Sequence, residues 1–249
     1  MRENRAKHKL QEGKPITVAF GDNTPDMIDF LGSLGFDAIR IEMEHGPTTW
    51  TELSDMSRAC DLWGMSSIAR VTSNEPWLIG RTLDRGVNGV IVPHVNTKEE
   101  ALQGIDAAKF APVGHRGVGG GRQGYGVTDY LQKANDETIV VVMIEDIKGV
   151  RNLGDILTVD DIDVFVVARS DLSHSMGYLG QPHHPKVEAV YDEAVARIIA
   201  SGRTAGVQVT DSDVDKYIDM GVGYLSTTWH HWVTAGASNF LRKVASKAG

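Results

Sequence analysis

Short runs of apolar, mostly β-branched residues alternate with longer amphipathic stretches from one end of the chain to the other. The runs have the length of strands, and the stretches between most of them carry apolar residues at helical spacing. The predicted strands are 16–20, 38–43, 67–71, 89–93, 139–145, 164–168, 204–209 and 223–227. The predicted helices are 27–34, 49–62, 76–85, 98–108, 185–200, 212–220 and a closing stretch at 229–247.

This alternation favours a single (β/α)8 barrel, the TIM-barrel form of the α/β class, over a doubly wound open sheet. We therefore expect residues 1–249 to form one barrel domain. In such barrels the functional side chains stand at the carboxyl ends of the strands, where the connecting loops surround the mouth. The polar residues that end the predicted strands are consequently the first place to look for chemistry.

Two neighbouring strands of the predicted barrel end in carboxylates. Glu145 ends the run V-V-V-M-I-E, and Asp171 follows V-F-V-V-A-R-S one strand–helix unit later. The two strands should be parallel neighbours, so their acids should lie at the same end of the barrel. Two carboxylates without a Cys or His ligand set suit a hard divalent cation, and Mg²⁺, Mn²⁺ and Co²⁺ fit alike.

Two further polar residues fall at the same end of their strands. His45 follows the second predicted strand and precedes Gly-Pro, so it should face the mouth, where a histidine can act as a general base. The alternative is a histidine that caps the next helix or bonds a loop carbonyl. Arg70 ends the third strand after apolar positions, so it must pair with a buried acid such as Glu42 or Glu44, or meet an anionic ligand.

Composition excludes several other kinds of protein. A formal net charge of −8 over 249 residues leaves no basic surplus for nucleic acid. The single cysteine, Cys60, allows no intrachain disulfide and no cysteine-based zinc cluster, and it suits a reducing compartment. The charged segment 1–14 lacks the apolar centre of a signal peptide, and no run reaches membrane-spanning length. We expect a cytoplasmic protein with no nucleic-acid or membrane partner.

Residues 111–126 form a long glycine-rich insertion, A-P-V-G-H-R-G-V-G-G-G-R-Q-G-Y-G. It is not a dinucleotide-binding fingerprint, because it does not run directly from a strand into a helix with the required spacing. It is not a Walker loop either, since it lacks Gly-Lys-Ser/Thr. We predict no organic cofactor, and we interpret the insertion as a flexible lid or a subunit contact.

Several segments together resemble the HpcH/HpaI aldolase family, the metal-dependent (class II) pyruvate aldolases of the 4-hydroxy-2-oxo acid or 2-dehydro-3-deoxyglucarate type. The resemblance covers nearly the whole chain and implies a (β/α)8 barrel, assembled as a homohexamer that is a trimer of dimers. It also implies that the C-terminal helix is exchanged between subunits. The segments are R-E-N-R-x-K, F-D-A-I-R-I-E-M-E-H-G-P, R-V-T-S-N, G-V-I-V-P-H-V, R-G-V-G-G-G-R, V-M-I-E and S-D-L-S-H-S-M-G-Y-L-G-Q-P-H-H-P-K-V.

Carried over residue by residue, the resemblance implies specific roles. The metal ligands fall on Glu145 and Asp171, the catalytic and substrate-binding arginine on Arg70, and the acid–base histidine on His45. Backbone amides around Ser170 and Asp171 would hold the substrate carboxylate. The resemblance leaves open whether His45 or a metal-bound hydroxide moves the proton of the 4-hydroxyl group.

The chain departs from the family pattern at three positions. Met143 stands two residues before Glu145 in place of the family's glutamine, Arg169 replaces a proline, and Glu42 replaces the aspartate that supports the histidine. Because Met143 should line the substrate site, we hypothesise a shifted preference among 2-oxo acids. Asp84 looks like a solvated partner of its neighbour Arg85, although it can approach the site of a neighbouring subunit.

The predicted function is a metal-dependent aldolase, a carbon–carbon lyase that makes or cleaves a 4-hydroxy-2-oxo acid through the enolate of pyruvate or a related 2-oxo acid. A Schiff-base aldolase would need a lysine at a strand end, and no predicted strand ends in one. Two alternatives stay open. One is a CoA-ester lyase of the citrate lyase β-type, and the other is a non-catalytic barrel that binds 2-oxo acids.

Overall fold

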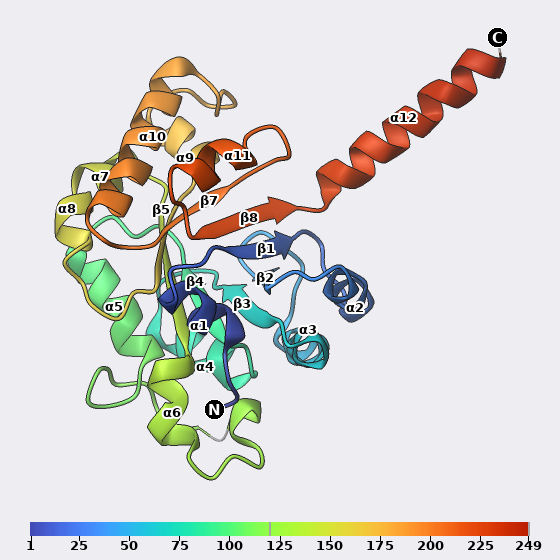
Figure 1. Ribbon diagram of the computed structural model, residues 1–249. Helices are drawn as coiled ribbons and strands as arrows, with labels where there is room; N and C mark the ends of the chain where they lie inside the picture. Colours follow the sequence, from blue (N-terminus) through green and yellow to red (C-terminus); the bar gives the residue numbers. More distant parts are fainter. Residues whose placement is uncertain (120, 249) are drawn as a thin grey trace.

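Eight parallel strands close into a barrel in chain order, with β1 paired to both β2 and β8. The structure is a computed structural model that describes residues 1–119 and 121–248. The predicted (β/α)8 barrel is confirmed (Figure 1), and each predicted strand agrees with the structure to within one residue at either end. The strands are β1 (Ile16–Phe20), β2 (Ala38–Glu42), β3 (Ser66–Arg70), β4 (Gly89–Val92), β5 (Ile139–Ile144), β6 (Val164–Val167), β7 (Ala205–Gln208) and β8 (Tyr224–Thr228).

Every predicted helix is present, and side-chain caps account for several starting points. Thr49 and Thr97 each form a capping box with the glutamate three residues later, which satisfies backbone N–H groups in the first turn. The helices that match the predictions are α2 (Pro25–Ser33), α3 (Trp50–Trp63), α4 (Pro76–Asp84), α5 (Lys98–Ala108), α10 (Pro185–Ala200), α11 (Val214–Asp219) and α12 (His230–Ala248).

Among the described residues, five further helices and one 3₁₀ turn were not predicted from the sequence, and each spans too few residues to repeat a helical period several times. They are α1 (Arg5–Gln11), α6 (Tyr130–Glu137), α7 (Ile147–Arg151), α8 (Leu153–Ile156), α9 (Arg169–Ser175) and the 3₁₀ turn η1 (Arg122–Gly124). One of them matters for the site, since α9 carries the second predicted carboxylate in its first turn.

The barrel interior is filled by side chains that point inward from the strands, so it is a packed core and not a pore. The buried interior set is Ile16, Val18, Ala38, Ile68, Ile91, Val141, Met143, Val164, Val166 and Tyr224. Towards the carboxyl ends, inward positions turn polar, with Arg40 and Glu42 on β2 and Arg70 on β3. The packed core therefore ends where charged side chains begin.

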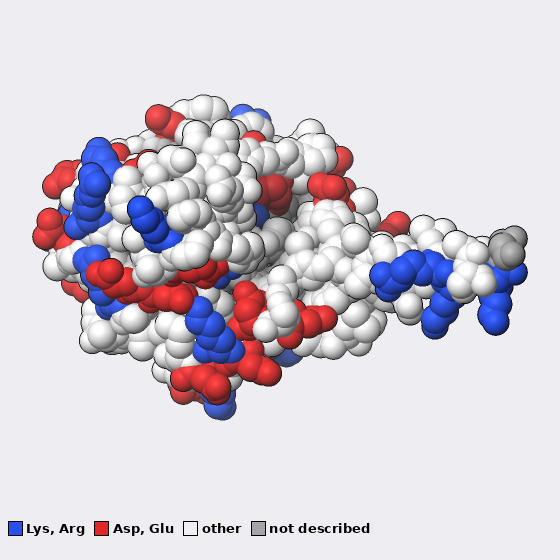
Figure 2. Space-filling model, turned by 90° about the horizontal axis from the view of Figure 1, so that it is seen from above, with Lys and Arg blue, Asp and Glu red and all other residues white. Residues whose placement is uncertain are grey.

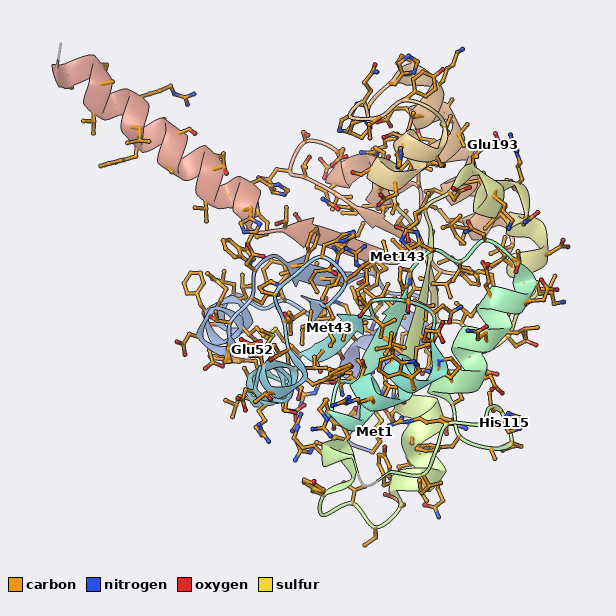
Figure 3. All side chains as sticks on the ribbon, turned by 180° about the vertical axis from the view of Figure 1, so that it is seen from behind. Met1, Met43, Glu52, His115, Met143 and Glu193 are labelled. Carbon is orange, nitrogen blue, oxygen red and sulfur yellow. The ribbon has the colours of Figure 1, made fainter. Side chains whose placement is uncertain are left out.

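The glycine-rich insertion lies at the opposite end of the barrel from these charged residues. The Arg122 side chain donates to Ser57 Oγ and to the carbonyl of Gly86, and Gln123 donates to the same carbonyl. These partners belong to α3 and to the turn before β4, which face the amino ends of the strands. In Figure 3, His115 of the insertion lies well away from Met143. The interpretation as a lid over the chain's own barrel mouth is wrong, and a subunit contact stays a prediction.

Helix α12 extends away from the barrel as a separate arm (Figures 1 and 2). Side chains 233–247 are all exposed, including apolar side chains. The exposed apolar side chains of the arm are Val233, Phe240, Leu241 and Val244. Within the described residues, no helix is both long and apolar enough to cross a membrane.

A buried lysine near the amino ends of the strands gives a testable pH dependence. Lys109 is 1 % exposed, and its Nζ donates to the carbonyls of Asn135 and Thr138 at 2.6 and 2.8 Å. Lys7 donates to the same Thr138 carbonyl at 2.8 Å and pairs with Asp163. Burial, together with the Lys7 ammonium, lowers the pKa of Lys109 to about 8.

We predict that the Lys109→Met variant will lose a pH-dependent part of the stability. The folded chain binds fewer protons than the unfolded chain between pH 8 and the ordinary lysine pKa of 10.5, so native stability should rise with pH across this window. Urea unfolding measures the free energy of unfolding of both proteins. The native value minus the variant value should be larger at pH 10 than at pH 7.5, by up to about 3 kcal/mol. An equal difference at both pH values would contradict the prediction, and the exposed Lys186→Met is the control.

Candidate active site at the barrel mouth

A cavity of about 450 Å³ opens at the carboxyl ends of the strands. Its wall combines cationic, acidic and hydroxyl-bearing side chains over an apolar base. The lining residues are Arg40, His45, Arg70, Met143, Val166, Val167, Ala168, Arg169, Ser170, Asp171, Pro182, His183, Gln208, Thr210, Ser212, Asp213 and Ser226. The cavity thus brings together His45, Arg70, Met143, Ser170 and Asp171, which the sequence predicts for one site.

Arg70 is fixed by two glutamates. Its Nε lies 3.0 and 2.8 Å from the two oxygens of Glu42, which stands directly opposite it in the β2–β3 register. Its Nη1 lies 2.9 Å from Glu44. Burial alone would lower the pKa of Arg70, but the hydrogen bonds and charges of the glutamates outweigh burial and raise it. Arg70 is therefore a permanent cation with a fixed orientation.

Glu42 supports the turn that carries His45. Its Oε1 accepts hydrogen bonds from the backbone N–H groups of Glu44 and His45, at 2.9 and 3.2 Å. The carboxylate thus holds the His45 backbone, and among the described residues the imidazole itself has no hydrogen-bond partner. The His45 side chain is exposed at the cavity wall and free to approach a ligand.

Glu145 is buried, with an exposed fraction of 2 %, one residue beyond β5. Its Oε1 accepts the backbone N–H of His94 at 2.6 Å, whereas its Oε2 is buried without a hydrogen-bond partner among the described residues. Burial raises the pKa of Glu145, and the charge of Asp171 raises it further, against the opposing effects of His94 and Arg70. A buried carboxylate with one unpaired oxygen calls for a cationic ligand.

His94 is a site residue that the sequence analysis missed. It follows β4 with φ of 55°, and its ring lies 3.0 Å from Glu44 and 3.3 Å from Glu145. His94 thereby links the glutamates that face Arg70 with the glutamate that ends β5. The rule that singles out His45, a polar residue just past a strand, also applies to the segment G-V-I-V-P-H-V.

Asp171 and Ser170 lie in the first turn of α9, four and three residues beyond the end of β6. No side chain of the described residues caps this helix, so its first backbone N–H groups keep their hydrogen-bonding capacity. Asp171 lies close enough to Glu145 for its charge to act on that carboxyl group. The two predicted carboxylates therefore converge on one end of the barrel.

The residues present fit a divalent cation. Within residues 1–119 and 121–248, no group of three or more His, Cys, Asp or Glu residues is arranged to hold a metal ion. Glu145 and Asp171 supply two carboxylates, and the unpaired oxygen of Glu145 provides a free ligand atom. Two protein carboxylates with the remaining positions left to water and substrate are typical of Mg²⁺ and Mn²⁺ sites in enzymes.

Two sequence-predicted residues have other surroundings than expected. Asp84 is not a solvated partner of Arg85, because it accepts from the buried Arg116 at 2.8 Å at the amino end of the barrel. It does not line the cavity of its own chain. Arg169 lines the cavity, but its guanidinium donates to Tyr217 at 2.7 Å and lies over the Tyr191 ring at 4.2 Å. The Arg169 guanidinium thus already has partners within the protein.

The fold and this mouth define a TIM-barrel enzyme whose site combines a paired arginine, an accessible histidine and two carboxylates. The chain matches the family model described as HpcH/HpaI aldolase/citrate lyase over residues 19–231. It is 32 % identical over 230 residues to a 4-hydroxy-2-oxo-heptane-1,7-dioate aldolase of Escherichia coli, covering 90 % of this chain and 88 % of that protein. The chain belongs to the HpcH/HpaI aldolase/citrate lyase family and is a carbon–carbon lyase.

Two further relatives agree with this assignment. A hydroxypyruvate/pyruvate aldolase of Roseobacter denitrificans is 36 % identical over 229 residues, which is 90 % of each chain. The crystal structure of an HpcH/HpaI aldolase/citrate lyase family protein from Burkholderia cenocepacia J2315 superposes with a TM-score of 0.90. That structure is 27 % identical and covers 97 % of this chain and 99 % of its own.

Proposed function

We propose that this chain is a divalent-metal-dependent aldolase that makes or cleaves 4-hydroxy-2-oxo acids and releases pyruvate, or a related 2-oxo acid, and an aldehyde. The observation that carries the proposal is the buried Glu145 oxygen, which has no hydrogen-bond partner among the described residues and lies within reach of the charges of Asp171 and Arg70, two residues that line the cavity. Both curated relatives described above are named aldolases, which favours this reaction over a CoA-ester lyase. An unpaired Arg169 charge in the cavity would favour a non-catalytic barrel. The Arg169 guanidinium instead contacts Tyr217 and Tyr191, so this argument for the alternative is removed.

Glu145 and Asp171 would hold the cation, which supplies Lewis-acid polarisation of the 2-oxo group when it is bound. The backbone N–H groups of the first turn of α9, around Ser170, would bind the carboxylate of the 2-oxo acid. Ser170 and Asp171 line the cavity, whereas Glu145 is buried, is not among the lining residues and lies within reach of the Asp171 charge. A 2-oxo acid would therefore be held by its carboxylate and its 2-oxo oxygen, with C3 directed into the cavity.

Arg70 would stabilise the charge that develops on the 2-oxo oxygen. Its Nη1 donates to the sulfur of Met143 at 3.8 Å, which is a weak contact because a thioether is a poor acceptor. A substrate oxygen can replace that sulfur without breaking the bonds that Arg70 makes to Glu42 and Glu44. The donor is therefore oriented before the reaction begins, which is the requirement for electrostatic stabilisation of an enolate.

His45 would act as the acid–base group. In the cleavage direction it accepts the proton of the 4-hydroxyl group, the C3–C4 bond breaks, and the bonding electrons move through C2 to the 2-oxo oxygen. The aldehyde leaves, and protonation of the enolate at C3 gives the free 2-oxo acid. The accessible imidazole, with no hydrogen-bond partner among the described residues, supports this assignment.

The proposal predicts EDTA-sensitive release of pyruvate from 4-hydroxy-2-oxo acids. Pyruvate formation is measured by coupling to lactate dehydrogenase over a panel of substrates with different aldehyde halves. The expected result is turnover that stops with EDTA and returns when Mg²⁺, Mn²⁺ or Co²⁺ is added in excess. The absence of metal-dependent cleavage or condensation with every 2-oxo acid tested would overturn the proposed function.

We also propose that residues 1–249 act as one domain and that the chain forms a homohexamer, a trimer of dimers with α12 exchanged between subunits. The exposed apolar side chains of α12, such as Phe240 and Leu241, support this assembly because water-exposed apolar area is reduced on association. The single, buried Cys60 supports a reducing, cytoplasmic location. In an assembly of this kind, Asp84 would approach the site of a neighbouring subunit.

A further inference from the structure

Arg40 is one of three arginines that line the cavity, with Arg70 and Arg169, and the proposed reaction does not use it. It stands two residues before Glu42 on β2, opposite Ile68 in the register, whereas Arg70 stands opposite Glu42 itself. Arg40 therefore lies one step deeper in the barrel than Arg70. It lines the same cavity, and its side chain is only 12 % exposed.

The Arg40 guanidinium is poorly paired for a buried cation. Among the described residues, only its Nη2 donates a hydrogen bond, to Glu42 at 3.1 Å, and its Nε is buried without a partner. The same Glu42 carboxylate already receives Arg70 and two backbone N–H groups, so Arg40 holds only a share of that charge. Its guanidinium carbon lies 3.9 Å from the centre of the Phe20 ring, which supports a cation without neutralising it.

In the part of the chain that the structure describes, Glu42 is the one carboxylate that acts on Arg40. Burial and the charge of Arg70 lower the pKa of Arg40. Burial raises the pKa of Tyr224 to about 12, and the Arg40 charge opposes that rise. The Tyr224 hydroxyl is also buried without a hydrogen-bond partner among the described residues. Arg40 thus lines the cavity with a donor that lacks an acceptor, and an anionic ligand group would supply one.

We propose that Arg40 is a specificity-determining residue that binds a second carboxylate of the substrate, in addition to the carboxylate at the first turn of α9. The inference rests on the proposed function and narrows its substrate class to 4-hydroxy-2-oxo acids with two carboxylates. Arg40 is suited to this role because it lines the cavity and its buried Nε has no hydrogen-bond partner among the described residues. The second carboxylate belongs to either the 2-oxo acid half or the aldehyde half.

The test compares the Arg40→Met and Arg40→Lys variants with the native chain. Each protein is assayed with two pairs of substrates. The two members of a pair differ in one half of the aldol product, which carries a carboxylate in one member and a neutral group in the other. The donor pair is 2-oxoglutarate and 2-oxobutyrate with propanal as acceptor. The acceptor pair is succinic semialdehyde and propanal with pyruvate as donor. The readout is the ratio of kcat/KM for the charged member to that for the neutral member.

We expect Arg40→Met to lower this ratio at least tenfold in one pair, mainly through a higher KM, and Arg40→Lys to restore part of it. The pair that responds identifies the half that carries the second carboxylate. The control is Arg81→Met, since Arg81 stacks on Trp50 at the same 3.9 Å but lies on α4 outside the cavity. Ratios within twofold of the native values in both pairs would overturn the inference. That result is expected if only water, and no substrate carboxylate, binds at Arg40.

The two proposals fail in different ways. If the native chain shows no metal-dependent reaction with any 2-oxo acid, the proposed function is wrong. If the native chain reacts and Arg40→Met lowers the charged and neutral reactions equally, Arg40 has a structural role and only the present inference is wrong. Circular dichroism at the assay temperature establishes whether each variant is folded. If Arg40→Met does not fold, the comparison of Arg40→Lys with the native chain still tests the inference.

Discussion

Replacing Glu145 by glutamine is expected to abolish metal-dependent turnover and, in EDTA, to make the chain more stable than the native protein. The substitution removes one of two proposed ligands, so pyruvate release should fall about 1,000-fold or more, which corresponds to about 4 kcal/mol of transition-state stabilisation. The gain in stability has a separate cause. Glu145 is buried, its Oε2 has no partner among the described residues, and Asp171 repels its charge.

The pH dependence separates these two effects. Because the pKa of the folded Glu145 is raised, the metal-free folded chain binds more protons than the unfolded chain between the ordinary glutamate pKa and the raised value. Its stability should therefore fall as pH rises through that window. The Glu145→Gln variant should lack this contribution, and thermal unfolding in EDTA at pH 4.5 and pH 7.5 measures the difference.

The neighbouring Asp146 supplies the control. Asp146 accepts the backbone N–H of Lys148 at the start of α7, outside the cavity, and asparagine caps a helix about as well as aspartate. Asp146→Asn makes the same change of charge one residue away, and we expect native turnover and native metal dependence. If Glu145→Gln kept metal-dependent turnover, or if Asp146→Asn lost it equally, Glu145 would not be a metal ligand.

The sequence was sufficient to predict the barrel because each strand is a short apolar run and each long helix shows a clear period. The end of the barrel that carries chemistry was also predictable, because polar residues follow these runs directly. Contacts between strands were not predictable. Glu42 and Glu44 were possible partners of Arg70; the β2–β3 register places Glu42 opposite it, and the chain just beyond β2 brings Glu44 to it.

Arg40 and Asp84 show two limits of reasoning from sequence. Arg40 lies inside a predicted strand, where pattern alone does not distinguish an arginine facing the cavity from one facing a helix. Asp84 looked like a surface residue because its partner, Arg116, is distant in sequence and belongs to the glycine-rich insertion. That insertion has no period, so its position at the amino end of the barrel depends on long-range contacts alone.

Replacing Arg70 by lysine is expected to separate the positive charge of this site from its geometry. Lysine keeps the charge but lacks the planar fork that binds Glu42 and Glu44 at once. It therefore cannot hold a fixed donor towards the substrate oxygen where Met143 now lies. We expect kcat to fall about 100- to 1,000-fold, the usual effect of losing one donor that stabilises a developing oxyanion. The KM should change much less.

The Arg70→Met variant distinguishes catalysis from folding. It leaves Glu42 with Arg40, and Glu44 with His94, as the remaining charged partners, which should lower the free energy of unfolding by up to about 3 kcal/mol. Arg70→Lys should recover most of that stability in urea unfolding without recovering kcat. The surface pair Arg58–Asp55 gives the control, since Arg58→Lys should leave both quantities near native. Recovery of kcat together with stability in Arg70→Lys would mean that Arg70 acts only by holding the glutamates in place.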